Sequence, residues 1–165
     1  MVRGLFEQFK TEKLKALAVW LPMMSEDDLE RATAAAESFR DDRVYHGWDP
    51  ERELAMLFGK ALNLAGAAWD VYLLYPPAVT WTADVPPQPA FWMHQLPTTT
   101  AIEGTHLFNP GLFAQELLHL LQSENTLGSR DLALLLHVKG LLAVRNESGR
   151  YSLRDIAAAV QVRAK

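Results

Sequence analysis

The feature that most constrains the fold is the apolar run AAWDVYLLY at residues 67–75. Aromatic and β-branched side chains over this length favour a buried strand over a helix of ordinary length. Pro76 and Pro77 follow at once, and proline cannot donate a hydrogen bond to a strand ladder. We therefore predict a strand here that is covered on both faces of its sheet.

The chain before this run predicts helices and strands in alternation. Apolar residues three to four apart indicate a short N-terminal helix, a helix over 25–39 capped by Ser25 and a helix beginning at Asp49-Pro50. A compact apolar run predicts a strand at 17–21, and Asp41 and Asp42 turn the chain into a second predicted strand at 43–48. This order favours parallel pairing through right-handed crossovers.

The chain after this run begins with a proline-rich segment, which holds six of the nine prolines between Pro76 and Pro97. Long stiff connections of this kind are often functional. A strand is expected at 91–96 and a helix from Asn109-Pro110. The later residues predict a leucine-rich helix from Ser129 to about Val138, then a hairpin and a final helix.

Length and composition point to one main domain with a small appendage. The chain has 165 residues, of which 49% are hydrophobic, enough for a proper core. We expect an α/β domain over 1–125 and a helix-hairpin-helix extension over 126–165. No apolar run is long enough to cross a bilayer, and the N-terminus lacks a signal-peptide core, so we expect a cytoplasmic protein.

The absence of cysteine excludes several kinds of chemistry. Disulfides, thiolate nucleophiles, cysteine-ligated zinc and iron–sulfur clusters all need a residue that this chain lacks. No nucleophile elbow and no phosphate-binding glycine loop is present. We expect no catalytic residue, no bound metal and no cofactor.

Residues 5–122 resemble the thioredoxin-like fold, in its thiol-disulfide reductase and peroxiredoxin branch. The resemblance rests on LKALAVWLP, RVYHGWDP, a helix with Phe58, AAWDVYLLY and a last helix. It implies a mixed sheet flanked by helices. The family's Cys-x-x-Cys and first strand are missing, and Ala67 and Ala68 stand where its cis-proline belongs. The resemblance therefore implies a redox-inactive protein, and no functional residue carries over.

The candidate binding residues lie around the central strand and the proline-rich segment: Trp69, Asp70, Trp81, Trp92 and His94. Tryptophans beside a stiff loop can be interface anchors, although they more often cover the core. A histidine in a strand is more often structural than a base or a ligand. Glu116 and His119 have the spacing of a di-metal motif, but no second copy of that motif exists.

The basic C-terminal part suggests another class of function. Residues 1–125 carry 9 Lys and Arg against 17 Asp and Glu, whereas 126–165 carry 7 against 3. Such a tail can bind nucleic acid, and GLLAVRNESGRYSL reads like the wing of a winged-helix domain. Only one helix precedes it where two are required, so we expect a packing or dimerisation appendage.

These observations predict a non-catalytic binding or protein-interaction module. Its partner is expected to be another protein or a second copy of this chain, because an edge left without its strand offers backbone groups for pairing. One alternative is a metal- or histidine-dependent enzyme with a pocket near His94 under the proline-rich loop. The other is nucleic-acid binding through the basic C-terminal segment.

Overall fold

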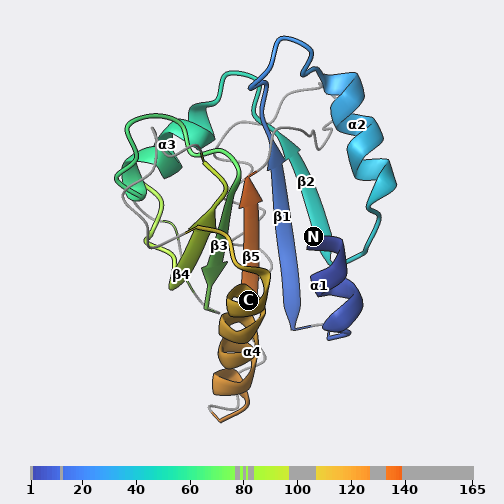
Figure 1. The fold of residues 1–165 in the computed structure, drawn as a ribbon, viewed down its shortest axis with the longest axis vertical. Coiled ribbons are helices and arrows are strands. Elements are labelled where there is room, and N and C mark those ends of the chain that lie inside the picture. Colours follow the sequence, from blue (N-terminus) through green and yellow to red (C-terminus); the bar gives the residue numbers. More distant parts are fainter. Residues whose placement is uncertain are drawn as a thin grey trace.

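The computed structural model describes residues 2–11, 13–76, 79, 81, 84–96, 107–126 and 133–138. Its strands form one five-stranded sheet in the order β2-β1-β5-β3-β4 (Figure 1). The elements in chain order are α1 Val2–Gln8, β1 Leu14–Trp20, α2 Leu29–Ser38, β2 Val44–Trp48, α3 Glu53–Ala61, β3 Val71–Tyr75, β4 Phe91–His94, α4 Pro110–Thr126 and β5 Ala133–Val138.

The sheet is mixed, which confirms the prediction of an α/β protein. β1 pairs in parallel with β2 on one side and with β5 on the other. β3 runs antiparallel to both β5 and β4, so the expectation that this strand would be parallel to β1 and β2 was wrong. The reason is visible in Figure 1: α3 stays near the end of the sheet where β2 finishes, and the chain enters β3 from that end.

The leucine-rich segment before Val138 is a strand and not the predicted helix. β5 lies at the centre of the sheet, with Leu136 opposite Leu17 of β1 and Leu73 of β3. A short run that is apolar throughout fits a buried strand or a buried helix equally well by periodicity. β5 thus places 133–138 in the same sheet as the earlier strands, while the predicted hairpin and last helix lie outside the described residues.

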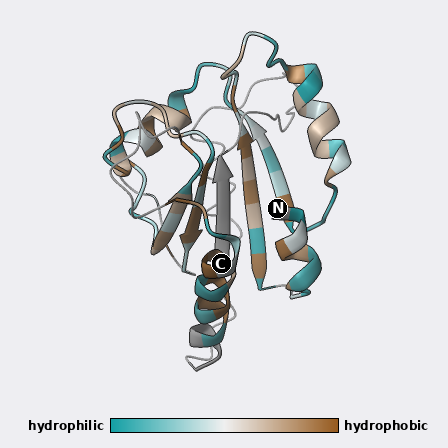
Figure 2. Ribbon diagram, in the orientation of Figure 1, coloured by the Kyte–Doolittle hydropathy of each residue, from teal (hydrophilic) through white to brown (hydrophobic). Residues whose placement is uncertain are grey.

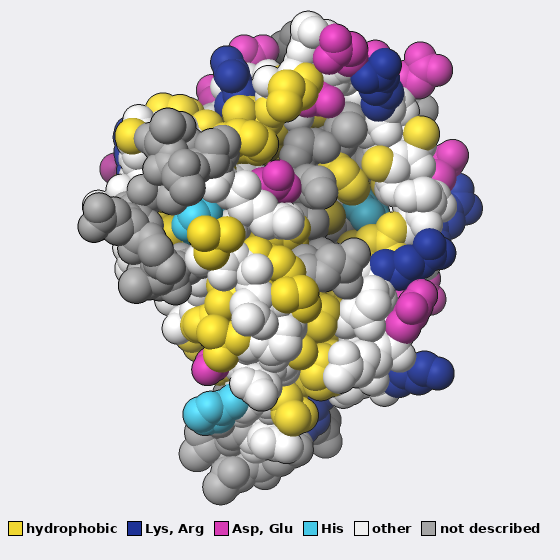
Figure 3. Space-filling model, viewed as in Figure 1, with side chains coloured by type: hydrophobic (Ala, Val, Ile, Leu, Met, Phe, Trp, Pro, Cys, Tyr) yellow, Lys and Arg dark blue, Asp and Glu magenta, His cyan; other side chains and the backbone are white. Residues whose placement is uncertain are grey.

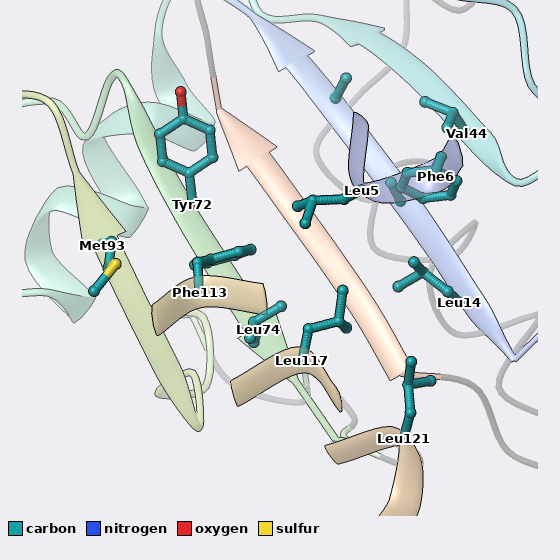
Figure 4. Close-up of a cluster of buried hydrophobic side chains, with 12 residues drawn as sticks. Leu5, Phe6, Leu14, Val44, Tyr72, Leu74, Met93, Phe113, Leu117 and Leu121 are labelled. Carbon is teal, nitrogen blue, oxygen red and sulfur yellow. The ribbon is translucent and has the colours of Figure 1, made fainter. Parts of the chain in front are cut away.

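Both faces of the sheet are covered by helices. α1 and α4 cover one face, where Phe6, Phe113 and Leu117 are almost fully buried (Figure 4). α3 covers the other face through Leu54 and Phe58. Hydrophobic residues accordingly dominate β1 and β3, whereas α2 alternates between hydrophobic and hydrophilic residues (Figure 2).

Two aspartates set the starts of α2 and α3, a few residues later than predicted. Asp28, and not Ser25, is the N-cap of α2, and its carboxylate accepts the Arg31 amide at 2.8 Å. The helix after Asp49-Pro50 begins at Glu53, and the Asp49 carboxylate accepts the amide of that residue at 2.9 Å. Each carboxylate satisfies a donor that the first helical turn leaves without an intrahelical partner.

Candidate functional site

The structure brings two of the predicted binding residues together at one end of the sheet. Asp70 precedes β3 and His94 ends β4. His94 is paired with Val71 in the ladder, and the Gln95 amide donates to the Asp70 carbonyl at 2.9 Å. Asp70 has a φ of 50°, a left-handed conformation that aspartate tolerates better than most residues. The entrance to β3 is therefore a tight, hydrogen-bonded corner.

The three candidate tryptophans lie against the hydrophobic cluster under α3. Trp69, Trp81 and Trp92 are each partly buried there. The ring of Trp81 meets that of Phe58 edge-on, with 6.0 Å between the centroids. These side chains cover the core on the α3 face of the sheet. Covering the core is the commoner of the two roles that we considered for them from the sequence.

His94 has the surroundings of a structural histidine. Its side chain is only 2% exposed, and its ring lies 5.6 Å from that of Trp92, centroid to centroid. The Leu96 amide donates to His94 Nδ1 at 3.1 Å. This nitrogen is occupied as an acceptor, so it is not presented to a substrate.

The described residues offer no metal centre and no membrane span. No group of three or more His, Asp or Glu side chains in this part of the chain could hold a metal ion. Glu116 and His119 both lie on α4, partly buried and exposed respectively. No helix in the described ranges has the length and hydrophobicity to cross a membrane. Figure 3 shows acidic and basic side chains interspersed along the α1 and α2 side, with no patch of a single sign on this face.

The feature that sequence reasoning missed is the outer side of β2, which is an edge strand of the sheet. The Ala16 amide donates to the Arg43 carbonyl at 2.8 Å, and the Asp49 amide donates to the Trp20 carbonyl at 3.0 Å. Backbone groups alternate in direction along a strand. The amides and carbonyls of Tyr45 and Gly47 therefore face β1.

The alternate residues of β2 direct their backbone groups away from the sheet. These residues are Val44, His46 and Trp48. The Val44 amide already donates to the Asp41 carbonyl at 2.8 Å. The other amides and carbonyls form a row that no strand of the described ranges pairs with. We define the β2 edge as the outer side of Val44–Trp48.

A buried arginine holds the beginning of the β2 edge. Arg43 donates to both carboxylate oxygens of Asp41, at 2.9 and 2.7 Å, and to the carbonyls of Phe6, Phe9 and Thr11. Its guanidinium also lies 4.7 Å from the centre of the Phe6 ring. The hydrogen bond with Arg43 is the main cause that lowers the pKa of Asp41. All five donors of the guanidinium are thus used: three bind carbonyls of α1 and of the segment after it, and two bind Asp41.

The other end of the β2 edge is held by Asp49, which is buried. Its carboxylate accepts the amides of Glu53 and Ala55 at 2.9 and 3.0 Å. Burial raises the pKa of Asp49, and these amide donors offset part of that effect. Since Arg43 and Asp49 are both bonded into the fold, the strand between them has a defined position.

His46 lies in the middle of the β2 edge in a neutral, oriented state. Its Nε2 lies 3.1 Å from the Phe39 carbonyl, and Trp20 Nε1 lies 3.5 Å from its Nδ1. One neutral tautomer satisfies both contacts, with the proton on Nε2. Burial lowers the pKa of His46, while the bond to Phe39 acts in the opposite direction.

The sequence of β2, VYHGW, contains none of the protective residues that edge strands commonly carry. Natural edges commonly carry lysine, proline, a bulge or an inward-pointing charge that discourages pairing with another chain. The five residues of β2 are uncharged and lack proline. The sequence alone shows that these residues are uncharged and lack proline. Their relevance to strand pairing becomes visible only from the strand order, which places β2 at the edge of the sheet.

The fold is that of a mixed α/β protein whose edge strand β2 carries neither a charged residue nor proline. No family model, no curated protein and no solved structure matches this chain.

Proposed function

We propose that this chain is a non-catalytic protein-interaction module that binds an extended polypeptide strand along the β2 edge. The observation that carries the proposal is the outward row of backbone groups at His46 and Trp48, held at both ends by Arg43 and Asp49. An added strand satisfies such groups through main-chain hydrogen bonds, while alternate side chains give specificity.

Rigidity supports this role. A strand that is already in its binding conformation loses little conformational entropy when a partner pairs with it. β2 is fixed by its ladder with β1 and by the carboxylates of Asp41 and Asp49 at its two ends. The cysteine-free composition agrees with a binding role without dithiol chemistry.

The experiment is amide hydrogen exchange, measured residue by residue in dilute protein. Amides in the ladder exchange slowly because they must open first, whereas outward amides of an open edge are accessible. We expect the amides of His46 and Trp48 to exchange much faster than those of Tyr45 and Gly47, which face β1.

The four amides lie next to one another in one strand, so the inward pair is a matched control for local stability. Slow exchange at all four positions in dilute protein would mean that the outer side of β2 is already occupied within the chain. That result would contradict the proposed function.

A further inference from the structure

We propose that the strand bound at the β2 edge is β2 of a second copy of this chain, antiparallel and related by a two-fold axis at His46. This inference rests on the proposed function and names its partner. Two identical edges can pair with each other only if their pattern is self-complementary about the axis. β2 meets that condition in its hydrogen-bonding groups and in its side chains.

The hydrogen-bonding pattern is symmetric about His46. In this register the two His46 residues form a hydrogen-bonded pair, and Val44 lies opposite Trp48 of the other copy. His46 can then donate to and accept from its counterpart. Each Trp48 amide can donate to a Val44 carbonyl, whereas the Val44 amide remains with Asp41. Four hydrogen bonds therefore cross the axis.

The side chains match on both faces of the strand. Val44 belongs to the cluster under α1 and α4, and Tyr45 lies against the cluster under α3. By alternation, Gly47 shares the face of Tyr45. The register places Tyr45 opposite Gly47 of the other copy, an aromatic residue covering a glycine across the pair. On the other face, Val44 lies opposite Trp48. Tyr45 thus meets glycine, Trp48 meets valine, and no two charges are opposed.

The neighbouring registers lack this match. A two-fold axis at Gly47 would also allow four hydrogen bonds, between His46 and Trp48, but would place glycine opposite glycine and Tyr45 opposite the buried Asp49. A two-fold axis at Tyr45 would oppose two tyrosines and leave Trp48 beyond the pairing. The side chains of β2 therefore favour the axis at His46.

The absence of cysteine makes this register directly testable. Across a hydrogen-bonded pair, Cα atoms lie about 5.5 Å apart, within the span of a disulfide. His46→Cys should cross-link to itself on mild oxidation. Trp48→Cys should not, because the two copies of this residue would lie about 14 Å apart along the strands. A mixture of Val44→Cys and Trp48→Cys should form a mixed dimer. Urea unfolding checks that each variant is folded, and sedimentation of the unmodified protein reports association without any substitution.

The outcomes separate the two proposals. Cross-linking of His46→Cys and of the Val44→Cys and Trp48→Cys mixture, with at least a tenfold lower yield for Trp48→Cys alone, supports the register. Cross-linking of Trp48→Cys or Tyr45→Cys alone, with none for His46→Cys, overturns it. A strictly monomeric unmodified protein at high micromolar concentration also overturns it. In either failure, fast exchange of the His46 and Trp48 amides in dilute protein leaves the proposed function standing.

Discussion

The two edges of the sheet, β2 and β4, differ in what covers them. On β4, the outward carbonyl of His94 accepts the Phe108 amide at 2.8 Å, and Leu107 forms an isolated bridge beside it. On β2, the outward groups of His46 and Trp48 face no strand of the described ranges. One edge is paired by its own chain, and the other is the edge at which we propose that a partner strand binds.

The two edge histidines show the same difference. His94 is 2% exposed and accepts a backbone amide, whereas His46 is only partly buried and lies beside Trp20 and Phe39. A buried histidine such as His94 fixes the nearby backbone through its side-chain hydrogen bond. A residue on an edge strand, such as His46, has backbone groups that can pair with another strand. The two histidines therefore differ in their surroundings because of where their strands lie in the sheet, and not because of residue type.

The largest expected effect comes from breaking the support of the β2 edge. Arg43→Ala leaves the Asp41 carboxylate and three α1-side carbonyls without their donor, so the free energy of unfolding should fall by about 3–5 kcal/mol. Arg40→Ala is the matched control, because the pair of Arg40 with Glu37 is exposed, and it should change stability by less than about 1 kcal/mol. Urea unfolding measures both, and equal losses would contradict the assigned role of Arg43.

The closed edge should depend on His94 as a structural acceptor. His94→Phe keeps an aromatic ring beside Trp92 but leaves the Leu96 amide without its acceptor, which should cost about 1–3 kcal/mol. His94→Asn loses the ring but keeps an acceptor near the position of Nδ1. Comparing the two variants therefore separates the effect of the hydrogen bond from the effect of the ring. Unchanged thermal stability of His94→Phe would show that this hydrogen bond does not hold the β4 edge.

The free energy of unfolding should depend on pH through His46, which lies on the β2 edge. Because its folded-state pKa lies below the ordinary value of 6.5, the unfolded chain binds the proton more readily. The stability contributed by neutral His46 is full above pH 6.5 and is lost as the pH falls through the lower folded-state value. His46→Phe should flatten this dependence in urea midpoints measured between pH 7.5 and pH 5. A wild-type slope equal to that of His46→Phe would contradict the neutral state assigned to His46.

The smallest effect on the folded monomer should come from protecting the open edge. Tyr45→Lys adds a charge of the kind that natural edge strands use, and it removes the residue that we place opposite Gly47. Stability should change by about 1 kcal/mol, because Tyr45 is partly buried, while self-association should be lost. Sedimentation would test this, and Tyr45→Phe, which keeps the ring, should still associate.

Local patterns in the sequence predicted most of the helices and strands, but not which strands lie next to one another in the sheet. The apolar run ending at Tyr75, the Asp49 turn and the helix after Pro110 were readable because caps, prolines and periodicity are local signals. β5 was misread because its leucines fit either a buried strand or a buried helix. Since β5 separates β1 from β3, that error also hid the strand order. The β2 edge could not be recognised without that order, although its uncharged sequence was in view.

The most direct test of the open β2 edge and its pairing is sedimentation velocity of the unmodified protein from low to high micromolar concentration, beside Tyr45→Lys. A five-residue edge buries less surface than a standard interface, so the dimer should be weak and concentration-dependent. We predict a rising sedimentation coefficient for the unmodified protein and a constant monomer value for the variant. A constant monomer value for both would contradict the pairing of β2 with β2, and equal association of both would place the contact elsewhere.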